Sequence, residues 1–151
     1  MNFIETLEVE NRKQALIYHV RDNYNEEIKI EDIEYTEYGF KTESMDFLVL
    51  TDSEALRATE EYIKDTLWAF NASFLVQFLP DECKNQKIEK SLSALSEKLC
   101  EAANPLFLWI FREQIKDIIR EAILSDGRGH FLAGYDGNEN EEGNYFIYRV
   151  D

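Results

Sequence analysis

The sequence predicts an α+β fold in which four or five helices pack on a small antiparallel sheet formed by two β-hairpins. Apolar residues recur at helical spacing through most of the chain, and two pairs of β-prone runs flank polar loops. The length of 151 residues is that of one domain. We therefore expect a single acidic domain over residues 1–151.

The N-terminal third should hold a helix and the first hairpin. Apolar residues from Leu16 to Tyr24 predict an amphipathic helix over 8–24. Residues 26–35 fit a short strand or a helical turn equally well, so we leave them irregular. Two β-prone runs at 38–40 and 47–50 then predict a hairpin.

The middle of the chain reads as consecutive helices. Thr51 and Glu54 have the spacing of a capping box, which predicts a helix that starts there and ends near residue 70. A short apolar helix over 73–79 should end at Pro80, and the stripe between 81 and 103 predicts another helix.

The C-terminal part should hold one more helix and the second hairpin. Asn104 and Pro105 fit the N-cap and first position of a helix that ends at Asp126, where Gly127 can take a left-handed conformation. The runs 130–135 and 144–150 predict the second hairpin. We expect the core to be led by Leu67, Leu92, Leu95, Leu99, Phe111, Ile115 and Ile119.

The net charge of −15 argues against binding to nucleic acid or to an anionic membrane. Residues 1–62 carry −10, residues 63–130 carry −1 and residues 131–151 carry −4. Fifteen charges match those on roughly 25 Å of duplex DNA, which has about one per 1.7 Å. One hypothesis is that aligned carboxylates occupy a basic protein groove in place of DNA, and the alternative is that scattered carboxylates only keep the chain soluble. The carboxylates concerned are Glu26, Glu27, Glu31, Asp32, Glu34, Glu37, Glu43 and Asp46.

A glycine-containing turn brings three chemically useful side chains together in the sequence. Asp126, Arg128 and His130 fall within five residues, which is a pattern suited to gripping an anion or a peptide carboxylate. The structural alternative is a plain junction that closes a helix and opens a strand. Tyr135 and Asp136 follow as further candidate binding residues, and tyrosine is frequent in protein interfaces.

We expect no cofactor, no metal site and no enzymatic activity. His19, His130, Cys83 and Cys100 show neither metal-ligand spacing nor the context of an activated nucleophile. The acidic loop from 136 to 142 lacks the ligand alternation of a calcium loop. The first residues do not resemble a signal peptide and no apolar run is long enough for a membrane span, so we expect a cytoplasmic location and free thiols. Five tyrosines near the expected strands should have a ring face exposed at the surface: Tyr35, Tyr38, Tyr135, Tyr145 and Tyr148.

The C-terminal pattern DGRGHFLAGYDG, followed by YFIYR, resembles a group of small acidic proteins of bacteriophages and other mobile elements, as do residues 48–52 and 67–71. The resemblance covers roughly 38–151 and implies a setting, with no catalytic residues to carry over. In that setting we expect a non-enzymatic protein that binds a basic surface of a host protein, as a DNA mimic that inhibits a restriction or CRISPR nuclease. The alternatives are an accessory or structural phage protein whose acidity serves solubility, and an enzyme that uses the turn from Asp126 to His130.

Overall fold

The computed structural model describes the chain from residue 3, and its side chains from residue 6. The described chain combines helices with a five-stranded antiparallel sheet, which confirms the predicted α+β class. It divides into two compact units where we expected a single domain: a first unit of Met1–Thr59 and Arg128–Asp151, and a second unit of Glu60–Gly127. The two are described separately below.

The sheet of the first unit has the strand order β1-β2-β3-β5-β4. Its strands are β1 (Glu34–Thr36), β2 (Gly39–Lys41), β3 (Asp46–Leu50), β4 (Asn140–Glu142) and β5 (Tyr145–Arg149). The predicted hairpin of 38–50 is present as β2 and β3, which pair at Phe40 with Phe47. Strand β1 begins within residues 26–35, for which the sequence predicts no regular element. It follows a 3₁₀ turn and extends the sheet beyond β2.

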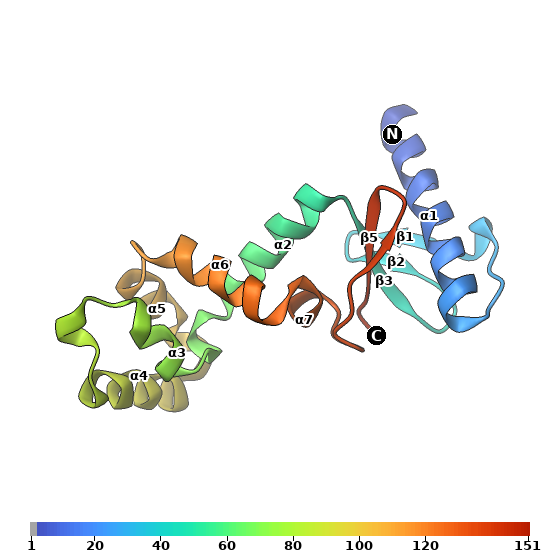
Figure 1. Cartoon of the computed structure of the whole chain (residues 1–151). Helices are drawn as coiled ribbons and strands as arrows, with labels where there is room; N and C mark the ends of the chain where they lie inside the picture. The colour runs from blue at the N-terminus through green and yellow to red at the C-terminus, as the bar shows by residue number, and fades with distance from the viewer. Residues whose placement is uncertain (1–2) are drawn as a thin grey trace. The chain divides into compact units, whose positions relative to one another are not determined.

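Helix α1 (Phe3–Tyr24) covers one face of this sheet (Figure 1). Leu16 and Val20 pack against Phe47, Val49 and the other side chains on that face. Because successive strand residues point to opposite faces, Leu48 and Leu50 pack on the other side with Tyr148. That second layer includes the start of α2 (Asp52–Asp65) and α7 (Arg128–Leu132).

The second predicted hairpin is wrong in one of its strands. Residues 128–132 form α7, and the partner of β5 is β4, with Glu142 opposite Tyr145. The apolar run after His130 fits a helix as well as a strand, and the polar sequence of β4 is typical of an edge strand, which alternation of apolar residues does not reveal.

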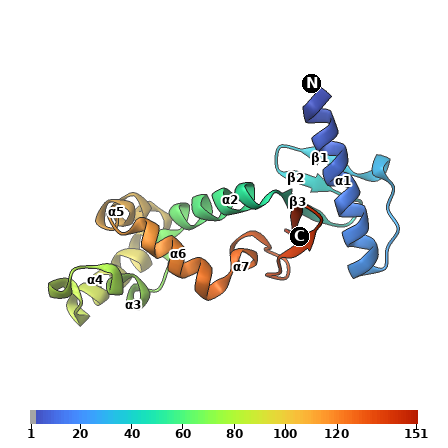
Figure 2. The same cartoon turned by 45° about the horizontal axis from the view of Figure 1, so that its top comes forward.

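The second unit is helical (Figure 2). It holds the end of α2, then α3 (Ala72–Leu75), α4 (Gln86–Leu99), α5 (Asn104–Ile110) and α6 (Ile115–Asp126). The helix predicted after Pro105 is divided between α5 and α6, while the predicted end at Asp126 is confirmed with Gly127 at φ +78°.

Its core contains most of the predicted side chains. Leu67, Leu92, Phe111 and Ile119 are buried and Leu95 and Ile115 are partly buried. Leu99 was expected in the core but is 47% exposed, since α4 ends there and Cys100 takes a positive φ of +51°. Asn104 does not cap α5: its amide accepts from the Trp68 N–H at 3.1 Å and donates to the Lys64 carbonyl at 2.8 Å.

Candidate functional site

Five of the eight predicted acidic residues gather around one depression in the first unit. This acidic opening has a volume of about 640 Å³ and is bordered by the loop after α1, by β1 and by the loop between β2 and β3. Lys41 is the basic residue on its rim. Its acidic residues are Glu26, Glu27, Asp32, Glu34 and Glu43.

The carboxylates of the acidic opening have no ion-pair partner in the part of the chain that the structure describes. Within the described residues, no lysine or arginine nitrogen lies within 4 Å of these five carboxylates. Lys41 instead pairs with Asp46 at 3.1 Å. The Asp32 carboxylate accepts the backbone N–H of Lys29 at 3.4 Å, which fixes the 3₁₀ turn. The opening therefore carries unbalanced negative charge.

The other three predicted acidic residues do not line this opening. Glu31 is exposed in the 3₁₀ turn, and Asp46 is engaged with Lys41. Glu37 lies at the turn between β1 and β2, where it lines a second groove.

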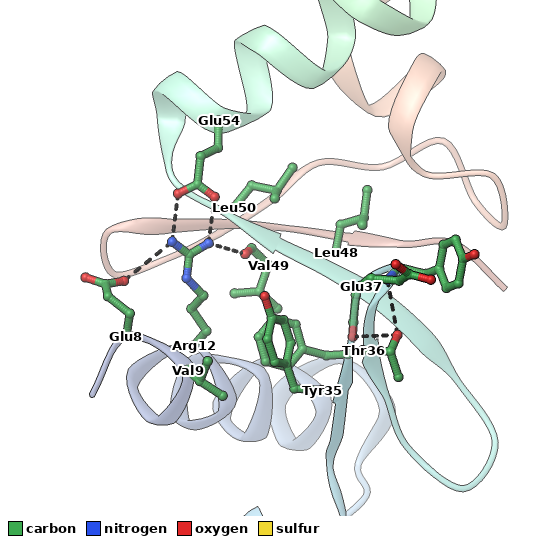
Figure 3. Close-up of a pocket in the computed structure, with 13 residues that line it drawn as sticks. Glu8, Val9, Arg12, Tyr35, Thr36, Glu37, Leu48, Val49, Leu50 and Glu54 are labelled. Atoms are coloured by element: carbon green, nitrogen blue, oxygen red, sulfur yellow. Dashed lines mark hydrogen bonds and ion pairs between the residues drawn. The ribbon is translucent and has the colours of Figure 1, made fainter. Parts of the chain in front are cut away.

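This second groove, here called the tyrosine groove, has a volume of about 490 Å³ and lies beside β3 where the β1–β2 hairpin ends (Figure 3). Tyr35 and Tyr38 are 51% and 77% exposed. Arg12 and Glu54 lie toward one end of the groove and Glu37 toward the other. Glu8, Val9 and the β3 residues from Leu48 to Leu50 complete the described walls.

Arg12 is held on the wall of the groove by several hydrogen bonds. Its guanidinium donates to both carboxylate oxygens of Glu54 at 2.7 Å, to the Val49 carbonyl at 2.9 Å and to Glu8 at 3.4 Å. The Val49 carbonyl points away from β5, and the pairing of β2 with β3 does not extend as far as Val49. Arg12 therefore supplies the hydrogen-bond donor that a neighbouring strand would otherwise provide. Hydrogen bonds from Arg12 hold the pKa of Glu54 below its ordinary value, against the burial that raises it. Arg12 falls within the helix predicted over 8–24, but nothing in the sequence pattern reveals this role.

The turn from Asp126 to His130, which the sequence marks as a candidate binding motif, has a structural role. Arg128 donates to both oxygens of Glu139 at 2.8 and 3.0 Å and to the Asp52 carboxylate at 2.8 Å. Tyr148 donates to the same Glu139 at 2.5 Å. Burial raises the pKa of Glu139, but the hydrogen bonds from Arg128 and Tyr148 together lower it by more, so the net shift is downward. These contacts tie α7 to α2 and to the segment before β4.

The remaining candidate residues of this region do not join Arg128 in a site. The His130 side chain is exposed beside the Phe131 ring, with the centroids 4.9 Å apart. Asp136 accepts the Asn138 N–H at 3.0 Å in a local turn. Tyr135 is 60% exposed, with the Arg149 guanidinium 3.6 Å from its ring centroid. Asp126 is the last residue of α6 in the second unit, near a small hollow lined by Phe74.

The five tyrosines that were predicted to be exposed differ in their burial. Tyr35, Tyr38 and Tyr135 are exposed as expected, and Tyr145 is partly buried. The expectation for Tyr148 is wrong: it is fully buried, because β5 lies inside the sheet and its ring packs against Leu132 and Ala133.

No group of three or more His, Cys, Asp or Glu side chains with the geometry of a metal site occurs in the part of the chain that the structure describes. Cys83 and Cys100 are free thiols. None of the helices described combines the length and apolar character that a bilayer crossing requires.

Comparison with known proteins adds no relative. No protein-family model matches the chain, and neither a curated protein nor a solved structure shows significant similarity to it.

Proposed function

We propose that this chain is a binding protein that presents the acidic opening of its first unit to a basic surface on another protein. The observation that carries the proposal is the grouping of Glu26, Glu27, Asp32, Glu34 and Glu43 around one depression, where no described lysine or arginine forms an ion pair with them. Unpaired carboxylates held close together create a local field that attracts a cationic partner.

The distribution of charge between the units supports this location. The first unit has 19 acidic and 8 basic residues, a net charge of −11, whereas the second has 12 and 8, a net charge of −4. If acidity served solubility alone, a more even distribution over the chain would do as well. Here the negative field belongs mainly to the unit that holds the opening.

The partner class follows from the charge pattern. Grooves that bind nucleic acid present clustered lysine and arginine side chains to a dense row of phosphates. A surface with clustered carboxylates competes for the same groove. Together with the resemblance to proteins of phages and mobile elements, this leads us to propose a host nuclease of restriction or CRISPR type as the target.

The state of the glycine turn supports binding over catalysis. Arg128, the cation of that motif, has its side chain 13% exposed and is engaged by Asp52 and Glu139. An arginine occupied in this way stabilises the fold and is not available to grip a substrate anion.

The test is capture of purified restriction and CRISPR nucleases on the immobilised chain, at about 50 and about 500 mM NaCl, with displacement by a short DNA duplex. We expect a nuclease to bind at low salt, to be released at high salt and to be displaced by the duplex. Changing Glu26, Glu27 and Glu34 together to Gln should weaken binding about tenfold or more.

A control variant removes the same charge from the second unit by changing Glu61, Glu97 and Glu121 to Gln, and it should bind like the original chain. Equal weakening by both triple variants would show a nonspecific charge effect. Undiminished binding by the variant of the acidic opening would instead support the accessory-protein alternative, in which acidity serves solubility.

A further inference from the structure

The first unit covers most of its accessible aromatic rings with its own arginines. Tyr145 lies under Arg12, Tyr18 under Arg21 and Phe146 under Arg128, with the guanidinium carbon 5.3, 5.2 and 4.7 Å from the ring centroid. Arg149 lies over both Tyr24 and Tyr135, at 5.0 and 3.6 Å. Such contacts are favourable because the negative face of the ring attracts the cation.

Among the described side chains of this unit, Tyr35 and Tyr38 are accessible and uncovered. They are 51% and 77% exposed, and among the described residues no guanidinium or ammonium group lies over either ring. One side of the Tyr35 ring packs on Phe40, with the centroids 5.0 Å apart. Its exposed part borders the tyrosine groove (Figure 3).

The groove also carries excess negative charge. Glu8, Glu37 and Glu54 line it with Arg12 as the one arginine or lysine among the described lining residues, and Arg12 is engaged by Glu54 and the Val49 carbonyl. Glu37 lies toward the end away from Arg12 and forms no ion pair within the described chain. Apolar stems of Val9 and Leu48 border the same space.

The turn that presents these groups is held in place. The Thr36 hydroxyl accepts the Tyr38 N–H at 3.2 Å and lies 3.4 Å from the Gly39 carbonyl oxygen, to which it donates. Gly39 has φ +134°, and a Cβ at this position would collide with the Phe47 carbonyl. A preorganised turn loses little conformational entropy when a ligand binds.

We propose that the tyrosine groove receives an arginine side chain of the protein partner, whose guanidinium lies over Tyr35 and pairs with Glu37. Arginine fits because its planar group stacks on aromatic rings, its stem covers apolar surface, and a carboxylate accepts two of its N–H groups. This deepens the proposed function and rests on it for the identity of the partner as a basic protein. The acidic opening attracts that partner, and the groove anchors one of its side chains.

The test titrates the isotope-labelled chain with a blocked pentapeptide that has a central arginine between glycines, followed by NMR of backbone amides. We expect saturable shifts at residues 35–39 and at Val49. The same peptide with citrulline, which has nearly the shape of arginine and no charge, should bind at least about fivefold more weakly. Tyr35→Ala and Glu37→Gln should each weaken arginine-peptide binding about threefold or more.

Two control variants separate the groove from general charge. Glu10→Gln removes an exposed carboxylate of α1 outside the groove, and the double change of Glu26 and Glu27 to Gln alters the acidic opening; both should leave binding within about twofold. Absence of shifts at 35–39, equal binding of the citrulline peptide, or equal weakening by the control variants would overturn the groove proposal. Because the peptide assay contains no nuclease, its result is independent of the capture test of the proposed function.

Discussion

At the scale of single residues, Arg12 shows how one side chain can close an open strand edge. Its guanidinium satisfies the Val49 carbonyl and both oxygens of Glu54, and its side chain is 16% exposed. The same contacts raise the pKa of Arg12, chiefly through the hydrogen bond to Glu54, so it stays charged. A lysine cannot reproduce this geometry, because an ammonium group lacks the planar fork.

We expect Arg12→Ala to lower the free energy of unfolding by about 2 to 3 kcal/mol, since it leaves a partly buried carboxylate and a carbonyl without their donor. Arg12→Lys should recover only part of this loss. Arg21→Ala is the control: Arg21 pairs with Asp22 where both side chains are 54% exposed, so its loss should destabilise the chain much less than the loss of Arg12. Urea unfolding followed by circular dichroism measures all three, and similar losses for the two alanine variants would contradict the assignment.

His19 is a buried titratable residue of α1. It is 2% exposed, its Nδ1 lies 3.0 Å from the Asn23 amide nitrogen, and its Nε2 has no hydrogen-bond partner within the described chain. Burial lowers the pKa of His19, and the opposing effect of Asp136 and Asp22 does not cancel this shift. The folded state therefore disfavours the protonated imidazole relative to the unfolded chain.

This predicts a stability that depends on pH. As the pH falls through the ordinary pKa of 6.5, His19 binds a proton in the unfolded chain before it does so in the folded chain, so the free energy of unfolding should fall until the pH is below the lowered pKa of the folded state. His19→Gln should remove this part of the dependence, and His130→Gln, which changes an exposed ring, should retain it. Urea unfolding of the three proteins between about pH 7 and about pH 5 is the measurement. An unchanged slope in His19→Gln would show that other groups cause it.

At the scale of elements, α7 is fixed by close backbone contact as well as by Arg128. A Cβ on Gly129 would collide with the Gly137 carbonyl and come within 2.8 Å of the Glu139 nitrogen. The glycine turn thus has a packing role: Gly129 lets α7 approach the turn that leads into β4.

We expect Gly129→Ala to destabilise the first unit by about 2 kcal/mol or more, because backbone must move to make room. Gly143→Ala is the control: Gly143 has φ +61° and open space around its Cβ position, so the expected cost is about 1 kcal/mol from backbone conformation alone. Thermal unfolding and hydrogen exchange of the β5 amides compare the variants. A smaller effect at Gly129 than at Gly143 would refute the packing argument.

At the scale of the whole molecule, the acidic charge is concentrated in the first unit and in part left unpaired. Ion pairs engage Glu54 and Glu139 there, whereas the five carboxylates of the acidic opening have no such partner among the described residues. Like charges held close together repel one another in the folded state, so this arrangement costs stability. A binding surface that awaits a cationic partner has this property.

The stability of the chain should accordingly rise when NaCl is increased from about 20 to about 300 mM, because salt screens this repulsion. Changing Glu26, Glu27 and Glu34 to Gln should raise the unfolding temperature at low salt and reduce its salt dependence. The matched change of Glu61, Glu97 and Glu121 in the second unit should have a smaller effect, since that unit is closer to neutral. Destabilisation by the first triple variant would mean that these carboxylates support the fold.

Local sequence signals were enough to predict the α+β class, the first hairpin, the beginning of α2 after Thr51, whose hydroxyl accepts the Glu54 N–H, and the end of α6 before Gly127. Each of these depends on local periodicity or on a cap, which neighbouring residues specify. The sequence also identified the acidic region that supplies the opening. It did not identify β1, the helix at 128–132 or the pairing of β4 with β5, because short or polar segments take their conformation from their tertiary neighbours.

Which charges are paired and which are unpaired can be read only from the folded chain. Sequence spacing cannot show that Asp46 is engaged with Lys41, that Arg128 is engaged with Glu139, or that Arg12 reaches Val49 across 37 positions. Ion pairs form between side chains that folding brings within a few ångströms, whatever their separation along the chain. The contrast between neutralised and unpaired carboxylates, on which the proposed function depends, is therefore a property of the fold.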